Sequence, residues 1–293
     1  MRRGNALIDE YQTMASLNRF EMRNLKKALK QYTERFVTPH FLDAPVWARS
    51  YYKPLGYPGD FQVMKYVYDR GQEGETLYAQ LMHFLGVEMG AFVRNRMQFT
   101  RDLIQTLLAE KDAPIRITNV GCGMAYEVAS LLETIDPITK RVHFTLVDQD
   151  DRALEPAYLM AHKQSKRHHP NVVVESFNTT FKKLTQPSAL FDQQPRQTLI
   201  YSLGILDYLP ARKAKQFVHG LYERLEPGGY LLIANVADGP NKLMWPLSYI
   251  FDWELIYRTE QEMYQLATGL DAASVKVQQD ATNHVHLLLL QKP

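Results

Sequence analysis

The feature that most constrains the fold of this chain is an apolar segment that runs into a glycine-rich turn and then into a helical pattern. The stretch ITNVGCGMAYEVASLL covers residues 117–132 and places Gly121 and Gly123 on either side of Cys122. Glycine lets the backbone turn tightly and approach a ligand closely. A helix that starts there presents free N–H groups and the positive end of its dipole to a carboxylate or phosphate. The strand before the turn and the helix after it favour a cofactor-binding α/β fold.

The second half of the chain repeats this alternation of short apolar runs and helical segments. Several of the runs are almost continuously apolar, as expected for parallel strands that are covered on both faces. The candidate strands are residues 115–120, 142–147, 172–177, 198–203, 229–236, 275–278 and 285–290, with notable helices at 125–135 and 211–225. The pattern predicts a layered α/β domain over residues 113–293.

Residues 1–112 carry helical periodicity instead. Apolar residues recur at three- and four-residue steps from position 77 to 107, which predicts one long amphipathic helix. The preceding loop, SYYKPLGYPGDF at 50–61, is rich in Pro, Gly and Tyr. We expect Tyr57 in this loop to fold over the site, or to pack between the two regions, and Asp60 to cap the next helix. The N-terminal region is therefore predicted to be an all-helical lid and substrate region.

Charge and composition exclude several classes of protein. The 34 basic and 32 acidic residues give a net charge of +2, too small for a global field that attracts nucleic acid or anionic membrane. Cys122 is the single cysteine, so neither an intrachain disulfide nor a cysteine-built metal cluster is possible, and we expect no metal. No apolar run approaches the roughly 20 residues of a spanning helix, and the N-terminus lacks the apolar core of a signal peptide. These features predict a cytoplasmic protein without stable membrane insertion, and they leave its oligomeric state open.

Two classes of cofactor compete for the glycine turn. A dinucleotide site prefers a third glycine where this chain has Tyr126, and a tyrosine there is expected to obstruct a pyrophosphate. A nucleoside without phosphates, such as S-adenosylmethionine, needs only the first turn. Asp148 ends the second predicted strand, where a carboxylate accepts hydrogen bonds from ribose hydroxyls. The alternative is that Asp148, Asp150 or Asp151 only caps the following helix.

Other residues at the ends of the predicted strands are candidates for the same site. Asn178 is placed to contact an adenine edge and Phe177 to wall its ring, although a turn asparagine beside a core phenylalanine is an equal alternative. Cys122 is expected to be a small packing residue rather than a nucleophile. The full set expected to bind the cofactor is Asn119, Gly121, Cys122, Gly123, Asp148, Gln149, Phe177, Asn178, Ser202 and Leu203.

The candidates for the catalytic side lie elsewhere in the sequence. Asp207 and Tyr208 follow the fourth strand, with turn formation or capping as the alternative for Asp207 and a lid over the core for Tyr208. Arg258 either pairs with Glu262, four residues on, or holds an anionic substrate by bidentate bonds. Together with Tyr57, these residues form the predicted catalytic set.

Five segments that occur in order carry a resemblance to the class I S-adenosylmethionine-dependent methyltransferases. They are KPLGYPGDF (53–61), NVGCGMAYEV (119–128), SLGILDYLP (202–210), LEPGGYLLIANV (225–236) and DWELIYRTEQEM (252–263). The glycine and PGG turns are generic to that superfamily. The GYPGD, LDYLP and DW-LIYRT parts are similar to the bacterial family that makes 3-hydroxypalmitic acid methyl ester, an extracellular quorum signal.

The resemblance implies a Rossmann-like sheet of seven strands with the last strand antiparallel, and S-adenosylmethionine as methyl donor. It also implies methyl transfer to a small-molecule oxygen, the carboxylate of a 3-hydroxy fatty acid. Another natural-product acid or an amine is an alternative acceptor, and an alcohol would need a base, for which Asp207 is the candidate. Asn119 stands where many relatives have an acidic residue and Ala125 replaces a third glycine. These departures motivate the second hypothesis, a donor-binding sensor or partner module without turnover.

Overall fold

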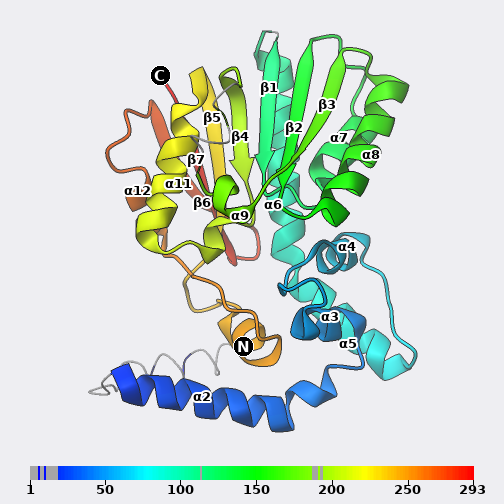
Figure 1. Cartoon of the computed structure of the whole chain (residues 1–293), viewed down its shortest axis with the longest axis vertical. Helices are drawn as coiled ribbons and strands as arrows, with labels where there is room; N and C mark the ends of the chain where they lie inside the picture. The colour runs from blue at the N-terminus through cyan, green and yellow to red at the C-terminus, as the bar shows by residue number, and fades with distance from the viewer. Residues whose placement is uncertain (1–5, 7–9, 11–18, 113, 187–190, 192–193) are drawn as a thin grey trace.

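The structure is a computed structural model that describes residues 6, 10, 19–112, 114–186, 191 and 194–293. The described part of residues 1–112 is helical throughout (Figure 1). Its elements are α2 (Arg19–Phe36), η1 (Thr38–His40), α3 (Pro45–Tyr52), α4 (Phe61–Asp69), α5 (Leu77–Met89) and α6 (Ala91–Glu110). None of the described helices combines the length and the apolar composition that crossing a bilayer requires.

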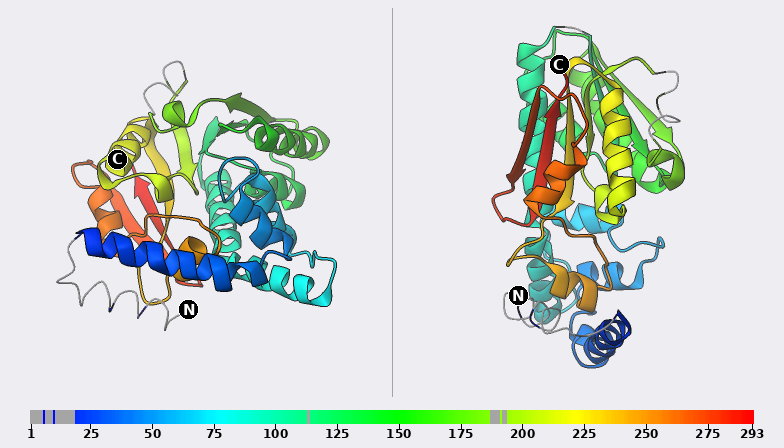
Figure 2. Two further views of the ribbon diagram at one scale, coloured as in Figure 1. Left: turned by 60° about the horizontal axis from the view of Figure 1, so that its bottom comes forward. Right: turned by 90° about the vertical axis from the view of Figure 1, so that its left-hand side faces the viewer.

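Residues from 114 onward form a seven-stranded sheet with helices on both faces, as the two views of Figure 2 show. The strands are β1 (Ile115–Val120), β2 (Val142–Asp148), β3 (Val172–Asn178), β4 (Gln197–Ser202), β5 (Leu225–Val236), β6 (Ser274–Gln279) and β7 (Val285–Gln291). The other elements are α7 (Tyr126–Thr134), α8 (Asp151–His168), α9 (Phe181–Leu184), η2 (Leu206–Tyr208), α11 (Ala211–Glu223), η3 (Trp245–Ile250) and α12 (Glu260–Leu266). The seven predicted strands are confirmed, each within a few residues.

The order of the strands is β3-β2-β1-β4-β5-β7-β6, and β7 runs antiparallel to both of its neighbours. The predicted seven-stranded sheet with an antiparallel last strand is therefore confirmed. The chain reverses its direction of winding between β1 and β4, which lie side by side. In sheets of this type the crevice at such a reversal, outside the carboxyl ends of the strands, is where ligands bind.

The apolar core lies in two layers, one on each face of the sheet. On one face, Phe144 of β2 and Ile117 of β1 belong to a cluster that includes Ile104 of α6 and Leu131 of α7. On the other face, Ile200 of β4 packs in a cluster with residues of α11 and α12. All six residues of β4 are buried, including the polar side chains of Gln197 and Thr198, which hydrogen-bond to Thr118 and Glu226.

The single helix predicted over residues 77–107 is wrong, because the structure divides it into α5 and α6 at Gly90. A Cβ atom at position 90 would lie 2.6 Å from Cγ2 of Val67 on α4, so the break occurs where α4 packs closest. Arg94 fixes the corner, since its Nη1 donates to the carbonyls of Val67 and Val87 at 3.1 Å each. The apolar residues keep their helical spacing from α5 into α6, so the sequence pattern gave no sign of the break at Gly90.

The helical region is attached to the sheet through the segment that follows β5. The hydroxyl of Thr33 on α2 donates to the carbonyl of Tyr249 in η3 at 2.8 Å. The rings of Trp47 on α3 and Phe251 stack with their centroids 3.6 Å apart. Helix α6 contacts both α7 and β7 and so continues from the helical region along one face of the sheet (Figure 1). These contacts hold the helices over the carboxyl ends of the strands.

Asp60 makes the predicted cap of α4. One carboxylate oxygen accepts hydrogen bonds from the amides of Gln62 and Val63, both at 3.0 Å. The carboxylate also accepts from Nε of Arg49 on α3 at 2.8 Å, while its side chain is only 1% exposed. Asp60 thus joins the start of α4 to α3.

We expect Asp60→Ala to lower the free energy of unfolding by about 2–3 kcal/mol. The loss of an N-cap costs about 0.5–2 kcal/mol, and a hydrogen bond to a charged group contributes about 1.5–3 kcal/mol. The measurement is urea unfolding followed by circular dichroism. Asp60→Asn is the matched control, because it keeps a cap acceptor and removes only the charge, so its loss should be smaller. A loss below about 0.5 kcal/mol for the alanine variant would contradict this role.

Candidate active site

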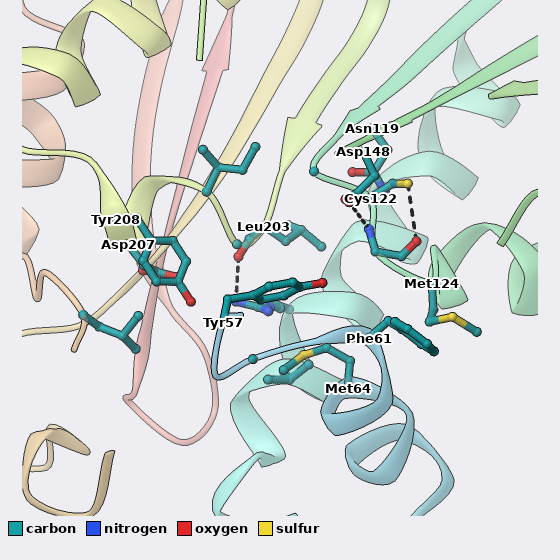
Figure 3. Close-up of a pocket in the computed structure, with 18 of the residues that line it drawn as sticks. Tyr57, Phe61, Met64, Asn119, Cys122, Met124, Asp148, Leu203, Asp207 and Tyr208 are labelled. Atoms are coloured by element: carbon teal, nitrogen blue, oxygen red, sulfur yellow. Dashed lines mark hydrogen bonds between the residues drawn. The ribbon is translucent and has the colours of Figure 1, made fainter. Parts of the chain in front are cut away.

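A pocket with about 170 Å³ of free volume opens at the carboxyl ends of β1, β2 and β4, beneath the helical region (Figure 3). Most of the residues predicted for the site line it. They are Tyr57, Asn119, Gly121, Cys122, Gly123, Asp148, Gln149, Leu203, Asp207 and Tyr208. The structure therefore brings the candidates for the cofactor side and those for the catalytic side into one cavity.

The glycine turn is fixed by bonds to the end of β2. The carbonyl of Val147 accepts hydrogen bonds from the amides of Gly121 at 2.8 Å and Cys122 at 3.0 Å. Gly121 has φ 73°, and a Cβ at that position would lie 2.6 Å from Cδ1 of Ile205. Only glycine satisfies both conditions, so the turn depends on this residue. Cys122 is buried as expected, and desolvation raises the pKa of its thiol well above the ordinary value.

Asp148 faces this turn from the tip of β2. Its Oδ2 accepts from the amide of Gly123 at 2.7 Å, and its Oδ1 accepts from the amide of Asp150 at 3.0 Å. The side chain is buried, and desolvation raises its pKa although the backbone N–H bonds act in the opposite direction. The cap of α8 is Asp150, which accepts from the amide of Arg152 at 3.1 Å. Asp148 is therefore free of the capping role that the sequence left open.

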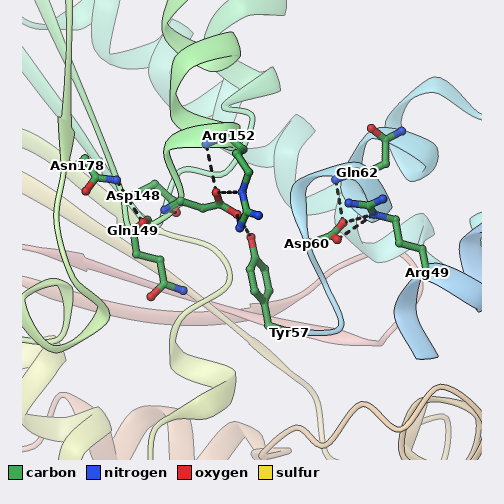
Figure 4. A network of polar contacts seen from close by, with 9 residues as sticks. Arg49, Tyr57, Asp60, Gln62, Asp148, Gln149, Arg152 and Asn178 are labelled. Atoms are coloured by element: carbon green, nitrogen blue, oxygen red, sulfur yellow. Dashed lines mark hydrogen bonds and ion pairs between the residues drawn. The ribbon is translucent and has the colours of Figure 1, made fainter. Parts of the chain in front are cut away.

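Tyr57 lines the pocket from the helical region (Figure 3), and Figure 4 shows its polar contacts. Its hydroxyl donates to Oδ2 of Asp150 at 2.9 Å, and burial raises the pKa of that hydroxyl. Nε of Arg152 donates to the other oxygen of Asp150 at 2.8 Å. Burial alone would raise the pKa of Asp150, but the bonds from Arg152 and Tyr57 outweigh it and the pKa is lowered. The loop at 53–61 is thus tied to the start of α8 beside Asp148.

Asp207 and Tyr208 form the opposite wall. Asp207 is buried, and its Oδ1 accepts from the amide of Val236 at 2.7 Å. Desolvation raises the pKa of Asp207 to about 6, and Arg96 and Arg258 partly oppose that rise. The hydroxyl of Tyr208 accepts a hydrogen bond from Nε1 of Trp253 at 2.9 Å, and burial raises its pKa. The 202–210 and 252–263 segments therefore meet at the pocket.

Three residues predicted for the cofactor side do not line the pocket. Phe177 is 42% exposed because β3 is an edge strand that lies open toward its carboxyl end. Nδ2 of Asn178 donates to the carbonyl of Gln149 at 3.2 Å, so this amide positions the loop after β2 (Figure 4). Ser202 is fully buried in the sheet, because the last residue of β4 still lies within the core. At the end of β4, Leu203 lines the pocket instead.

Arg258 does not line the pocket either, so the structure does not bring it together with the other residues of the predicted catalytic set. It is 3% exposed. Its Nη1 donates to the carbonyl of Leu206 at 3.0 Å and to Oδ1 of Asn235, and its Nη2 donates to the carbonyl of Leu209. The expected pairing with Glu262 is replaced by a capping box between Glu262 and Thr259. Arg258 thus satisfies the carbonyls of η2 and ties that segment to β5.

Tyr126 was expected to stand in the way of a pyrophosphate, but it does not line the pocket. Its ring packs against Tyr68 on α4 with the centroids 4.5 Å apart. The reason is the course of α7, which turns its first residue toward the helical region. The side chain of Tyr126 is therefore not among those that face the pocket at the glycine turn.

Two charged residues in the pocket were missed from the sequence. Arg96 of α6 lies in the middle of a helix whose other basic residues read as a solvated face, so no local signal marked it. Glu127, in the first turn of α7, is 2% exposed and accepts from Nδ2 of Asn119 at 2.7 Å and the hydroxyl of Tyr201 at 2.8 Å. The position of Glu127, four residues after the glycine turn, could have marked it in the sequence as a residue near the site. Within the described residues, no group of three potential metal ligands occurs.

Comparisons with known proteins identify the fold. No family model matches the sequence, and no curated protein matches it. Among solved structures, the chain is similar to a possible exported protein from Bordetella parapertussis, with a TM-score of 0.61, 14% identity and coverage of 80% of this chain and 79% of that one. It is also similar to magnesium protoporphyrin IX methyltransferase from Synechocystis PCC 6803 with bound S-adenosylhomocysteine, with a TM-score of 0.54, 12% identity and coverage of 84% and 98%.

A third similar structure is a putative O-methyltransferase from Nostoc punctiforme PCC 73102, with a TM-score of 0.52, 12% identity and coverage of 86% of this chain and 70% of that one. The chain therefore has the Rossmann-like fold of class I S-adenosylmethionine-dependent methyltransferases, as the sequence predicted. At these identities the likeness establishes the fold, and the site must be argued from its own residues.

The raised pKa of Asp207 makes the stability of the protein depend on pH. Between about pH 4 and pH 6 the folded state holds a proton on Asp207 that the unfolded chain has released, so the free energy of unfolding falls as pH rises. A shift from 3.8 to about 6 corresponds to about 3 kcal/mol. Asp207→Asn keeps an acceptor for Val236 and removes the titration.

We therefore expect wild type to lose about 2–2.5 kcal/mol relative to Asp207→Asn between pH 4 and pH 7, since the unfolded chain has already released part of this proton at pH 4. Urea unfolding of both proteins across that range measures the difference directly, and titrations elsewhere cancel in the comparison. Parallel pH profiles for the two proteins would show that Asp207 titrates normally.

Proposed function

We propose that this chain is an S-adenosylmethionine-dependent methyltransferase that acts on the carboxylate of a small molecule. The observation that carries the proposal is the position of Asp148, a buried carboxylate that faces the Gly121–Gly123 turn inside the pocket. The fold supports the proposal through its likeness to solved structures named as methyltransferases.

The residues of the pocket fit the proposed donor. Asp148 offers a carboxylate for the ribose hydroxyls, and the turn leaves open space at Gly123, where a Cβ would meet nothing within 4 Å. Oδ1 of Asn119 is buried and has no hydrogen-bond partner among the described residues, so it can accept from a ligand. When bound, S-adenosylmethionine supplies a methyl group on a sulfonium. The replacement of an acidic residue by Asn119 thus leaves an acceptor in place.

The titratable groups of the pocket favour an acceptor that is already ionised. No histidine occurs among the described residues that line it. Burial raises the pKa of the Tyr57, Tyr68 and Tyr208 hydroxyls, which makes them poor bases near pH 7. Asp207, with a pKa of about 6 and one oxygen held by the amide of Val236, is the remaining base, and an alcohol acceptor would depend on it. A carboxylic acid needs no base, since it is ionised at neutral pH.

The walls toward the helical region favour an acceptor with an apolar body. Phe61, Met64, Phe92, Trp253 and Leu255 line this side of the pocket. A second cavity of about 30 Å³ continues between α3, α4, α5 and η3, and Met64, Phe92 and Trp253 belong to both. The flexible side chains of methionine adapt to irregular apolar ligands. The acceptor we propose is therefore a 3-hydroxy fatty acid, converted to a methyl ester signal.

The protein contributes alignment and closure to such a transfer. Holding two reactants in line supplies about 7–11 kcal/mol of the barrier. A carboxylate and a sulfonium neutralise each other in the reaction, so a site that excludes water favours it. The contact of Tyr57 with Asp150 and of Gly59 with Trp253 closes the loop at 53–61 over the pocket. The cytoplasmic location stays a prediction.

The direct test is incubation of the purified chain with methyl-labelled S-adenosylmethionine and 3-hydroxy fatty acids of graded chain length. We expect a labelled methyl ester, with turnover that rises with chain length because the cavity walls are apolar. If no ester forms but amines or other natural-product acids, offered in parallel incubations, become labelled as N-methylamines or methyl esters, the proposal moves to those acceptors. Donor binding without turnover on any acceptor would favour the sensor hypothesis.

Asp148→Asn is expected to weaken the binding of S-adenosylhomocysteine about 10- to 100-fold, because a hydrogen bond to a charged group contributes about 1.5–3 kcal/mol. The asparagine oxygen can still accept from Gly123, but its Nδ2 then faces the amide of Asp150, so urea unfolding of the variant must first show that the fold is retained. Asp151→Asn is the matched control, since Asp151 is exposed in the first turn of α8. Isothermal titration calorimetry on the three proteins measures the effect, and equal affinities would remove Asp148 from the donor site.

A further inference from the structure

Arg96 lies at the bottom of the pocket, where α6 passes under the end of β4. Its side chain lines the pocket, although the residue is only 9% exposed. Its Nη1 donates to the carbonyl of Leu203 at 2.6 Å, the bond drawn at Leu203 in Figure 3. Its guanidinium carbon lies 5.8 Å from the ring centroid of Phe92, so one face of the guanidinium is covered. These contacts fix the group in place without neutralising its charge.

The guanidinium lacks a counter-ion in direct contact. No carboxylate of a described residue lies within 4.0 Å of its nitrogens, and its Nε is buried without a hydrogen-bond partner. A buried charge in this state is costly, and buried polar groups in folded proteins are normally paired. The planar fork of an arginine matches a carboxylate in two parallel hydrogen bonds. Nε of Arg101 is also buried without a partner, but Arg101 lies outside the pocket. The unmet donor of Arg96 points to a ligand because the same guanidinium also lines the pocket.

The two acidic residues that face Arg96 across the pocket are already engaged. Glu127 accepts from Asn119 and Tyr201, and Asp207 accepts from the amide of Val236. Each still interacts with Arg96 at longer range, since the positive charge lowers the pKa of both carboxyls. The two carboxylates stabilise the charge of the guanidinium, but neither accepts a hydrogen bond from it, so donors of Arg96 remain for a ligand.

We propose that Arg96 binds the carboxylate of a ligand in this pocket. The inference rests on the proposed function for the identity of the ligands, which offer this group from two sources. One is the α-carboxylate of the methyl donor. If the ribose lies at Asp148 on β2, the other end of the donor can extend past β1 to the tip of β4, because β1 is the only strand between β2 and β4 in the sheet. The other is the carboxylate of the acceptor. Arg258, which the sequence suggested for this task, already donates to three protein acceptors, Leu206, Leu209 and Asn235.

The test is calorimetry on the full chain with four ligands. They are S-adenosylhomocysteine, its decarboxylated analogue, a 3-hydroxy fatty acid and the primary amide of that acid. The variants are Arg96→Gln and Arg96→Lys, where lysine keeps the charge and lacks the fork. Arg101→Gln is the matched control, because Arg101 lies on the same helix and donates to Thr134 outside the pocket.

We expect Arg96→Gln to weaken binding of one carboxylate ligand about 10- to 100-fold, the effect of a lost charged hydrogen bond. If the variant binds S-adenosylhomocysteine more weakly but its decarboxylated analogue equally well, Arg96 binds the carboxylate of the donor. If the variant binds the fatty acid more weakly but its amide equally well, Arg96 binds the carboxylate of the acceptor. Arg96→Lys should fall between wild type and Arg96→Gln, and Arg101→Gln should match wild type.

Two results would overturn the inference. One is equal affinity of wild type and Arg96→Gln for both carboxylate ligands. The other is an equal loss for the carboxylate ligands and their neutral analogues, which would make Arg96 a structural residue. Both leave the proposed function intact when wild type binds S-adenosylhomocysteine and transfers methyl. If wild type fails to bind that nucleoside, the proposed function fails, while the fatty acid and its amide still test Arg96.

Discussion

The pocket depends on three hydrogen bonds that tie the glycine turn to the end of β2. Two amides of the turn, from Gly121 and Cys122, share the carbonyl of Val147, and the amide of Gly123 donates to Asp148. The end of β2 thereby supplies acceptors for the three amides that directly follow β1. The turn also orients the carboxylate of Asp148 into the cavity, so the backbone geometry and the chemistry of the site have one cause.

The cover of the pocket depends on a second close contact, between the two segments that distinguished this chain from methyltransferases in general. Gly59 lies directly against the indole ring of Trp253, where a side chain on residue 59 would collide with the ring. Trp253 in turn donates to Tyr208. The loop at 53–61 therefore seats on a residue that lies some 200 positions later in the chain. Helices and sheet meet at the site because these distant segments fit each other.

The sequence predicted what is written locally. The strands, the glycine turn and Asp148 follow from apolar runs and from the residue that ends each run, so they were found without knowing which strands pair. The corner at Gly90, the inward face of Arg96 and the clamp made by Arg258 depend on packing between distant segments. Arg96 and Arg258 look alike in sequence as cations on otherwise solvated segments. Only the tertiary structure shows that Arg258 is saturated with acceptors and Arg96 is not.

The balance of charge in the pocket connects these observations to the reaction. The described lining residues include three carboxyl groups, on Glu127, Asp148 and Asp207, and one cation, Arg96. In the proposed reaction, such an excess would favour the cationic sulfonium over its neutral product and so assist both binding of the donor and release of the spent nucleoside. The same excess would repel an anionic acceptor. The proposed acid would therefore approach only where the sulfonium and the guanidinium of Arg96 offset that repulsion, so the cation on α6 is the group on which an acidic substrate would depend in this pocket.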